Sequence, residues 1–331
     1  MNLPASRIET ADGDLPFAVD YASGPIAIVR PSRSISFAAC LPAIRPFVEA
    51  ELPRTGAFLF RGFEKLSAEA FNDVITGFGK KLVTYDYGST PRRQIANHVY
   101  SSTEYPAHQW IPQHNEQSYT TKWPARIYFY CDLPATEGGE TPISDSRVVY
   151  QSISPSIRDR FARKQLMYVR NYANGLDLPW SQVFRTEDPR QVEAFCRQHD
   201  ISYEWLPDGG LRTRQICQSE ARHPVSGAAV WFNQAHLFHV SALDASLRET
   251  LLSIVSEADL PRNVYYGDGS AMEESVLDEI RSCYRQATIA EAWQEGDLLV
   301  LDNMLFAHGR APFQGNRRIL VGMAGNLSNS G

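Results

Sequence analysis

Short apolar runs rich in β-branched and aromatic residues recur along this chain, and they predict strands. Most are bounded by Gly, Asp or Asn, as is typical of buried strands that end in turns. The predicted strands are residues 56–63, 125–133, 166–172, 211–217, 229–233, 297–303 and 317–325. Strands dominate at both ends of the chain.

Helix-start patterns gather in the middle of the chain. Ser154 and Asp188 are each followed by proline, which suits an N-cap and the first helical position. Ser270 and Glu273 have the spacing of a capping box. The helix predicted after them has apolar residues on one face at positions 276, 280, 283, 284 and 287.

Strands at both ends with a helical excursion between them favour a mainly β fold with α insertions. Such a pattern suits a β-sandwich or jelly roll closed by strands that are distant in sequence. A doubly wound parallel sheet would require regular alternation of strands and helices, and neither GxGxxG nor GxxxxGK[ST] occurs. No repeat or long linker divides the 331 residues, so we expect one domain over residues 1–331.

Composition narrows the class of protein. With 43% apolar residues the chain can bury a core, and its net charge of −6 with scattered Lys and Arg argues against a nucleic-acid partner. Five cysteines without a CxxC pair argue against a disulfide framework and a thiolate zinc site. The N-terminus has no apolar signal segment and no run could cross a membrane, so we expect a cytoplasmic protein.

The segment HNEQSY, residues 114–119, is the first candidate for chemistry. If it is extended, His114 and Glu116 project from one face and Asn115 from the other. An imidazole nitrogen and a carboxylate oxygen can then bind one cation. HxE alone is also typical of a solvated strand edge, so a metal site needs a third ligand from elsewhere.

His308 is the best candidate for the third ligand. It follows the predicted buried strand at 297–303, in a second short apolar run, where it can pack in the core or face a cavity. Two histidines and one carboxylate, with the remaining positions left to water, form the facial triad of non-haem Fe(II) oxygenases.

Iron needs a source of electrons to use O₂ for a two-electron oxidation, and a metal-chelated 2-oxo acid supplies them. The distal carboxylate of that acid requires a fixed cation. A hairpin after His308 would return the strand that starts at Arg317 and Arg318 to the metal's side. Arg318 shares a predicted strand face with Leu320 and Gly322, which leaves room for a ligand. We therefore expect Arg318 to hold the carboxylate with two hydrogen bonds, and Arg317 to be solvated.

These residues belong to longer stretches that resemble the taurine dioxygenase superfamily (TauD/TfdA) of Fe(II)/2-oxoglutarate oxygenases. The stretches are HNEQSY, WPARIYFYCDLPATEGGETPISDSR at 123–147, YYGDGS at 265–270 and LDNMLFAHGRAPFQGNRRILVGMA at 301–324. The resemblance covers roughly residues 55–325, nearly a whole catalytic domain, with a helical insertion at about 150–290. It is closest to the SyrP-like branch, which hydroxylates amino acids in nonribosomal peptide pathways. It implies a double-stranded β-helix, that is, a cupin-like and clavaminate-synthase-like jelly roll.

Carried over by position, the resemblance makes His114, Glu116 and His308 the iron ligands. It gives Thr141 and Arg318 the role of binding 2-oxoglutarate. Since halogenating relatives have a small residue in place of the carboxylate ligand, Glu116 implies hydroxylation or a related oxidation.

One position departs from the family pattern. Many relatives have a second arginine four residues after the first, and Gly322 stands there in this chain. The task of that arginine falls to Arg310, to Arg317 or to no residue. Arg310 is accordingly a candidate for substrate binding.

The implied reaction is hydroxylation of an unactivated C–H bond of an amino acid or amino-acid-derived substrate in natural-product biosynthesis. It consumes O₂ and 2-oxoglutarate and releases succinate and CO₂. The substrate is free or tethered to a peptidyl carrier protein. A desaturase and a taurine-type small-acid dioxygenase are alternatives within the class. A non-catalytic jelly-roll binding module and a metal-dependent hydrolase are alternatives from other classes.

His236 and His239 form a rival pair at helical i, i+3 spacing. A zinc hydrolase could combine them with Glu116 or His223, but HExxH is absent and no third ligand has motif spacing. We expect the pair to pack in the core or to line the substrate pocket, with His236 as a candidate substrate contact.

Overall fold

The structure is a computed structural model that describes residues 15–21, 26–84, 93–102, 105–172, 175–176 and 178–328. Residues 1–14, which the prediction about a secretory signal concerns, lie outside these ranges. None of the helices within the ranges combines the length and the apolar character that a membrane crossing requires.

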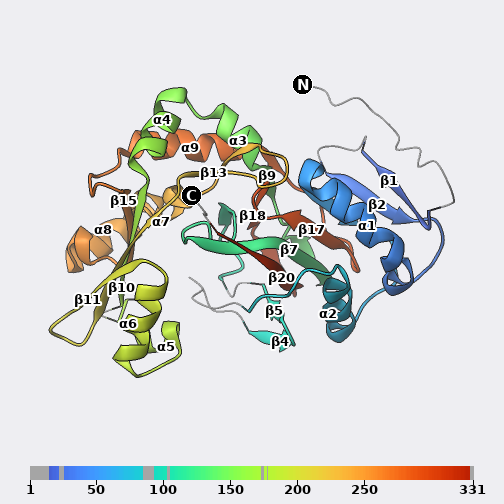
Figure 1. The fold of residues 1–331 in the computed structure, drawn as a ribbon, viewed down its shortest axis with the longest axis horizontal. Helices are drawn as coiled ribbons and strands as arrows, with labels where there is room; N and C mark the ends of the chain where they lie inside the picture. The colour runs from blue at the N-terminus through green and yellow to red at the C-terminus, as the bar shows by residue number, and fades with distance from the viewer. Residues whose placement is uncertain are drawn as a thin grey trace.

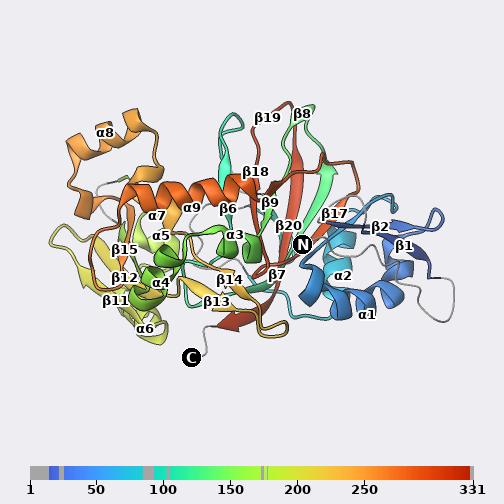
Figure 2. The ribbon, with the colours of Figure 1, turned by 90° about the horizontal axis from the view of Figure 1, so that it is seen from above.

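Two sheets form the centre of the molecule (Figures 1 and 2). The larger sheet has, in spatial order, β1 (Phe17–Asp20), β2 (Ala27–Pro31), β3 (Ala57–Phe60), β17 (Leu298–Asp302), β7 (Lys122–Leu133), β20 (Arg318–Ser328), β5 (Val99–Ser101) and β4 (Gln94–Ala96). The smaller sheet has β16 (Thr288–Ile289), β9 (Ile143–Asp145), β18 (Phe306–Arg310) and β6 (Ile111–His114). At the centre of both sheets, neighbouring strands come from distant parts of the chain: β7 lies between β17 and β20, and β18 lies between β9 and β6. The predicted jelly roll is confirmed.

The two faces of the larger sheet bury different partners. On β7, Ile127, Phe129 and Cys131 face inward to a core shared with the smaller sheet, whereas Tyr128 and Tyr130 face outward. The outward face is covered by α1 (Phe37–Thr55), which lies beside β1 and β2 in Figure 1, and by α2 (Ala68–Gly77), which packs next to α1 and toward β5. Because side chains alternate along a strand, a residue's parity on β7, β17 or β20 decides whether it faces the helices or the interior.

Local sequence defines both ends of α1. Ser36 is its N-cap, and the Ser36 hydroxyl accepts the backbone N–H of Ala39. Gly56 ends the helix at φ +82°, where a Cβ atom would lie 2.6 Å from the Phe306 ring. Glycine is required there for both the left-handed backbone and the close approach of the ring.

The middle of the chain forms a second layer beside the jelly roll (Figures 1 and 2). A four-stranded antiparallel sheet has the order β11–β12–β10–β15, and β13 and β14 form a short hairpin. Outside this layer, β8 pairs with β19 in a two-stranded sheet that joins segments distant in sequence. The strands are β8 (Glu137–Gly138), β10 (Leu166–Tyr172), β11 (Ile201–Trp205), β12 (Leu211–Cys217), β13 (Glu220–Arg222), β14 (Ala229–Trp231), β15 (Arg262–Tyr266) and β19 (Phe313–Gln314). The helices are α3 (Ser146–Ser152), α4 (Pro155–Lys164), α5 (Trp180–Phe184), α6 (Pro189–Gln198), α7 (Ala235–Phe238), α8 (Ala245–Ile254) and α9 (Glu274–Gln286).

All seven predicted strand segments contain a strand, and Ser154 and Asp188 precede α4 and α6 as predicted. The predicted capping box is wrong. Helix α9 begins at Glu274 with Glu273 as its N-cap residue, while the hydroxyl of Ser270 accepts a hydrogen bond from Lys164.

Candidate metal centre

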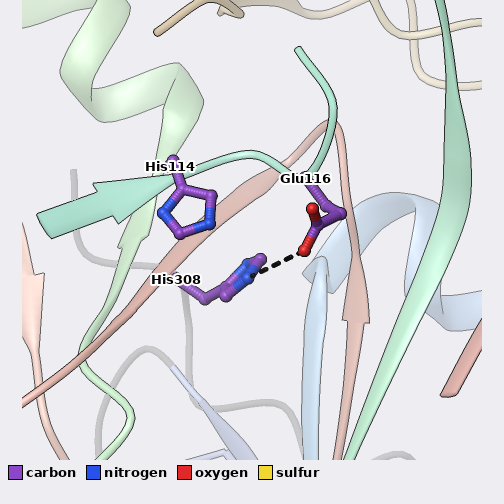
Figure 3. A group of neighbouring side chains, drawn as sticks. All are labelled: His114, Glu116 and His308. Carbon is purple, nitrogen blue, oxygen red and sulfur yellow. Dashed lines mark ion pairs between the residues drawn. The ribbon is translucent and has the colours of Figure 1, made fainter. Parts of the chain in front are cut away.

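Three side chains from two segments that are distant in the sequence converge in the interior (Figure 3). One nitrogen of His114, one nitrogen of His308 and one carboxylate oxygen of Glu116 all lie within 4.8 Å of one another. His308 Nε2 is 3.8 Å from Glu116 Oε2, and both residues are buried. The predicted convergence of His114, Glu116 and His308 is confirmed.

The smaller sheet places the two histidines. His114 is the last residue of β6 and pairs directly with His308 of β18 in the antiparallel register. Residues directly opposite in such a pair project to the same side of the sheet. The imidazole centroids are accordingly 4.7 Å apart.

Glu116 is held in a different way from the extended strand that we expected. β6 ends at His114, and residues 116–119 form a turn. The side chain of Asn115 points into the protein and donates to the Ser146 hydroxyl at 3.0 Å. The turn therefore brings the Glu116 carboxylate toward the two histidines. The extended strand that we expected would have placed Glu116 without a turn.

A backbone hydrogen bond orients the His114 ring. Its Nδ1 lies 2.8 Å from the carbonyl oxygen of Pro112, which can only accept, so Nδ1 carries the proton and donates. The lone pair then lies on Nε2, where it is available to a metal ion.

The donor set fits iron. Two imidazoles and one carboxylate with open positions are typical of non-haem Fe(II) oxygenases, whereas structural zinc sites are closed by four protein ligands. Across the part of the chain that the structure describes, no other His, Cys, Asp or Glu cluster of three or more has this geometry. His223, a candidate ligand for a hydrolase, instead lies 3.1 Å from Asp302.

Two cavities meet at the metal ligands. The first is lined by His114 and Glu116 and has a volume of about 360 Å³, which is within the usual range for small-molecule sites. Apart from these two ligands, Arg262 and His239, its lining is uncharged and mostly apolar. The uncharged residues are Tyr105, Ile111, Pro112, Tyr119, Gln234, Leu237, Phe238, Val240, Ala242, Leu243, Leu251, Leu260 and Pro261.

The second cavity has a volume of about 30 Å³, shares Ile111 and His114 with the first and also reaches His308. Its polar lining includes Thr141, Arg310 and Arg317. The Thr141 hydroxyl accepts the indole N–H of Trp293 at 3.2 Å, so its own proton is directed elsewhere.

Arg310 and Arg317 give this second cavity a positive charge. Arg317 donates from Nε to the Gly139 carbonyl at 2.8 Å, and Arg310 donates to the backbone carbonyls of Tyr105, Pro106 and Gln109. Burial and the neighbouring Arg310 lower the pKa of Arg317 to about 10, and burial lowers the pKa of Arg310. No carboxylate among the described residues forms an ion pair with either guanidinium. The cavity therefore favours an anion.

Arg318 lies elsewhere, contrary to expectation. Its side chain is 60% exposed and forms an ion pair with Asp132 on the surface. The register of β20 against β7 shifts between Arg318 and Ile319, and Ile319 and Val321 line the second cavity. The face that we assigned to a ligand, with Leu320 and Gly322, is the face that packs against the helices.

The helix-facing side of β20 also explains why residue 322 is a glycine. A Cβ atom at this position would lie 2.3 Å from Cδ1 of Ile75 in α2. The position therefore has no room for an arginine, and its glycine accommodates a helix, not a ligand.

His236 is not among the residues that line either cavity. It is buried, stacks on Tyr284 with centroids 4.5 Å apart, and donates from Nε2 to the carbonyl of Gln113 at 3.0 Å. Burial lowers its pKa to about 3, so it is neutral. His236 was expected to contact substrate; the structure instead places it behind the cavities, where it supports β6 next to His114. His239 does line the first cavity.

From the sequence, Arg317 was only an alternative, and Trp293 and, apart from His239, the cavity-lining residues between 234 and 262 were not identified. Arg317 was detectable only through the strand parity of β20. Trp293 approaches Thr141 from 152 residues away, with no motif to connect them.

Comparison with known proteins agrees with this geometry. The profile of the family described as "Taurine catabolism dioxygenase TauD, TfdA family" matches residues 27–324. The dapdiamide synthesis protein DdaC of Enterobacter agglomerans is 40% identical over 276 residues, covering 83% of this chain and 84% of that protein. A clavaminate synthase-like protein of Arabidopsis thaliana is 29% identical over 321 residues, covering 90% and 93%.

A solved structure shares the fold. It is PvcB, described as an Fe, α-ketoglutarate-dependent oxygenase from an isonitrile synthetic pathway. It superposes with a TM-score of 0.57 at 17% identity over 98% of both chains. With the triad in place and the family profile matching most of the sequence, this chain belongs to the TauD/TfdA family of Fe(II)/2-oxoglutarate-dependent dioxygenases.

Proposed function

We propose that this protein hydroxylates an unactivated C–H bond of an amino-acid-derived small molecule in natural-product biosynthesis. The observation that carries the proposal is the meeting of two unlike cavities at His114. One is cationic and suits a dicarboxylate co-substrate, while the other is mostly apolar and suits a substrate. The two reactants can thus reach one metal from two cavities that share His114.

In the cationic cavity, Arg317 is the proposed anchor for the distal carboxylate of 2-oxoglutarate. A guanidinium can bind a carboxylate with two parallel hydrogen bonds, and Arg317 is half-buried beside Thr141. Thr141 would donate its hydroxyl proton to the same carboxylate. Arg310 would add charge without leaving its three backbone carbonyls.

The apolar cavity supports a substrate that presents a hydrocarbon segment to the metal. Phe238, Val240 and Leu243 contribute to its lining, and such surfaces exclude water from the reacting carbon. The ligand Glu116 occupies the position that a halide would need, which supports oxygen transfer over halogenation.

The relatives support the pathway assignment. DdaC is named for dapdiamide synthesis and PvcB is described as belonging to an isonitrile synthetic pathway. We propose that this chain is related to the SyrP-like branch, whose members act in nonribosomal peptide pathways, and that its substrate is an amino acid, free or tethered to a peptidyl carrier protein.

Anaerobic reconstitution tests the reaction class. Fe(II) and 2-oxoglutarate together should produce a metal-to-ligand charge-transfer absorption in the wild type, and admission of O₂ should then yield succinate. His308→Ala should abolish both signals. Absence of both in the wild type, or retention of both in His308→Ala, contradicts the proposal.

Mass spectrometry tests the form of the substrate. Candidate amino acids are offered free and as thioesters on a carrier protein, and the products are screened for a gain of one oxygen. A gain only on the loaded form supports the tethered substrate, whereas equal reaction of the free amino acid rules it out. Loss of two hydrogens in place of the gain would identify a desaturase.

A further inference from the structure

The side-chain amide of Asn303 joins the two segments that carry the metal ligands. Asn303 is fully buried in the turn between β17 and β18, shortly before His308. Its Oδ1 accepts the backbone N–H of Glu116 at 2.7 Å, and its Nδ2 donates to the Glu116 carbonyl at 3.0 Å. One side chain therefore binds both backbone polar groups of a metal ligand.

The remaining polar groups of Asn303 are also used. The amide donates to the Pro124 carbonyl at 2.8 Å, and the Asn303 backbone N–H donates to Ala125 at 3.0 Å. The Asn303 backbone carbonyl accepts the side-chain amide of Asn115 at 2.7 Å. Because a backbone N–H can only donate and a carbonyl can only accept, this network allows one orientation of the Asn303 amide.

Glu116 depends on this support because it lies in a turn and not in a strand. Glu116 is 3% exposed, so water cannot replace the two hydrogen bonds between Asn303 and its backbone. A buried polar group left without a partner costs about 1–3 kcal/mol, and the turn would relax to avoid that cost. Relaxation of the turn would move the Glu116 carboxylate relative to the two histidines.

We propose that Asn303 is a positioning residue that presets Glu116 for metal binding, so that the affinity of the protein for Fe(II) depends on its amide. Asn303 acts through the backbone of Glu116 and does not itself touch the metal position. Groups that hydrogen-bond to a metal ligand without touching the metal typically contribute about 10- to 100-fold to metal affinity.

The variant Asn303→Ala has a matched control in Asn171→Ala. Asn171 is 3% exposed and donates to the carbonyls of Ala258 and Leu260, and it accepts from Arg212 at 2.6 Å. It therefore makes the same kind of contacts as Asn303, but in the insertion sheet and outside both cavities. Fe(II) dissociation constants are measured anaerobically by competition with a chromophoric chelator, and thermal unfolding is measured for both metal-free variants.

Asn303→Ala should bind Fe(II) about 10- to 100-fold more weakly than the wild type. Asn171→Ala should retain wild-type affinity while losing a comparable amount of thermal stability. If Asn303→Ala keeps the wild-type dissociation constant and only its stability falls, the amide is structural alone and the proposal is overturned.

A measurement on the unaltered metal-free protein decides the matter if Asn303→Ala does not fold. Amide hydrogen exchange is read by mass spectrometry over residues 115–119. The Glu116 amide should exchange slowly although it lies in a turn, because Asn303 Oδ1 binds its hydrogen. Exchange at the rate of an open loop would overturn the proposal.

Discussion

Arg317 and Arg318 are adjacent in the sequence, yet only Arg317 lines the cationic cavity. Arg317→Gln should weaken 2-oxoglutarate binding by about 1.5–3 kcal/mol, or roughly 10- to 100-fold, because a charged hydrogen-bonding partner is lost. The dissociation constant is obtained by titrating the charge-transfer absorption with 2-oxoglutarate.

Arg318→Gln is the matched control for that prediction. It removes the same charge one residue away and breaks only a surface ion pair with Asp132, so binding should change less than about twofold. A larger effect of Arg318→Gln than of Arg317→Gln would restore the original assignment from strand parity.

Trp293 should act on 2-oxoglutarate through Thr141. The indole N–H fixes the Thr141 hydroxyl as an acceptor on one side, so its proton is available to a carboxylate on the other. Trp293→Phe removes that N–H and should weaken 2-oxoglutarate binding by about 0.5–1.5 kcal/mol, the usual net value of one hydrogen bond.

A double-mutant cycle with Thr141→Val checks this coupling. Once the hydroxyl is gone, Trp293→Phe should have almost no further effect on the dissociation constant of 2-oxoglutarate. Additive effects of the two substitutions would show that Trp293 acts by packing alone.

At the scale of elements, the close approach of β6 to β18 determines the distance between the two histidines. A Cβ atom on Gly309 would lie 2.5 Å from the carbonyl oxygen of Ile111. Backbone cannot yield as a side chain can, so Gly309→Ala should push β6 away from β18. We expect Fe(II) affinity to fall at least about 10-fold and stability to fall by about 1–3 kcal/mol.

Gly322→Ala is the control that separates a loss of Fe(II) affinity from a general loss of stability. Its Cβ atom would meet Ile75 on the helix side of β20, and the larger sheet separates this side from the metal ligands. It should lower stability in urea denaturation without changing the Fe(II) dissociation constant, and Ile75→Val should recover part of the loss. Equal metal affinity in Gly309→Ala and Gly322→Ala would refute the strand-spacing argument.

The metal ligands were predictable from the sequence because each lies in a recognisable segment. His114 and Glu116 form the HxE pattern, His308 lies in a short apolar run after a buried strand, and the family resemblance identifies all three. The anchor for the co-substrate was not predictable in the same way. Side chains alternate along β20, so that Arg317, Ile319 and Val321 line the cavity. The sequence alone does not show which of the two faces of this strand is the inner one.

At the scale of the whole molecule, the missing information is long-range packing. The contact of Asn303 with Glu116 spans 187 residues and that of Trp293 with Thr141 spans 152, and neither leaves a local pattern. Similarly, the apolar cavity joins residues 105–119 to residues 234–262, whose sequence contains few interpretable motifs. Only the folded layers bring these segments together.

Acid stability of the whole molecule should depend on His236. Burial holds its folded-state pKa near 3, whereas an unfolded histidine titrates near 6.5. Between these values the unfolded chain binds one more proton, so the stability present above about pH 6.5 is lost as the pH falls.

His236→Gln can still donate to the Gln113 carbonyl but does not titrate. The decrease in unfolding free energy from pH 7 to pH 5 should therefore be smaller by about 2 kcal/mol in this variant. Urea denaturation at the two pH values, with a chelator present so that metal release does not contribute, measures the difference. An unchanged decrease in His236→Gln would mean that His236 takes up a proton in the folded state.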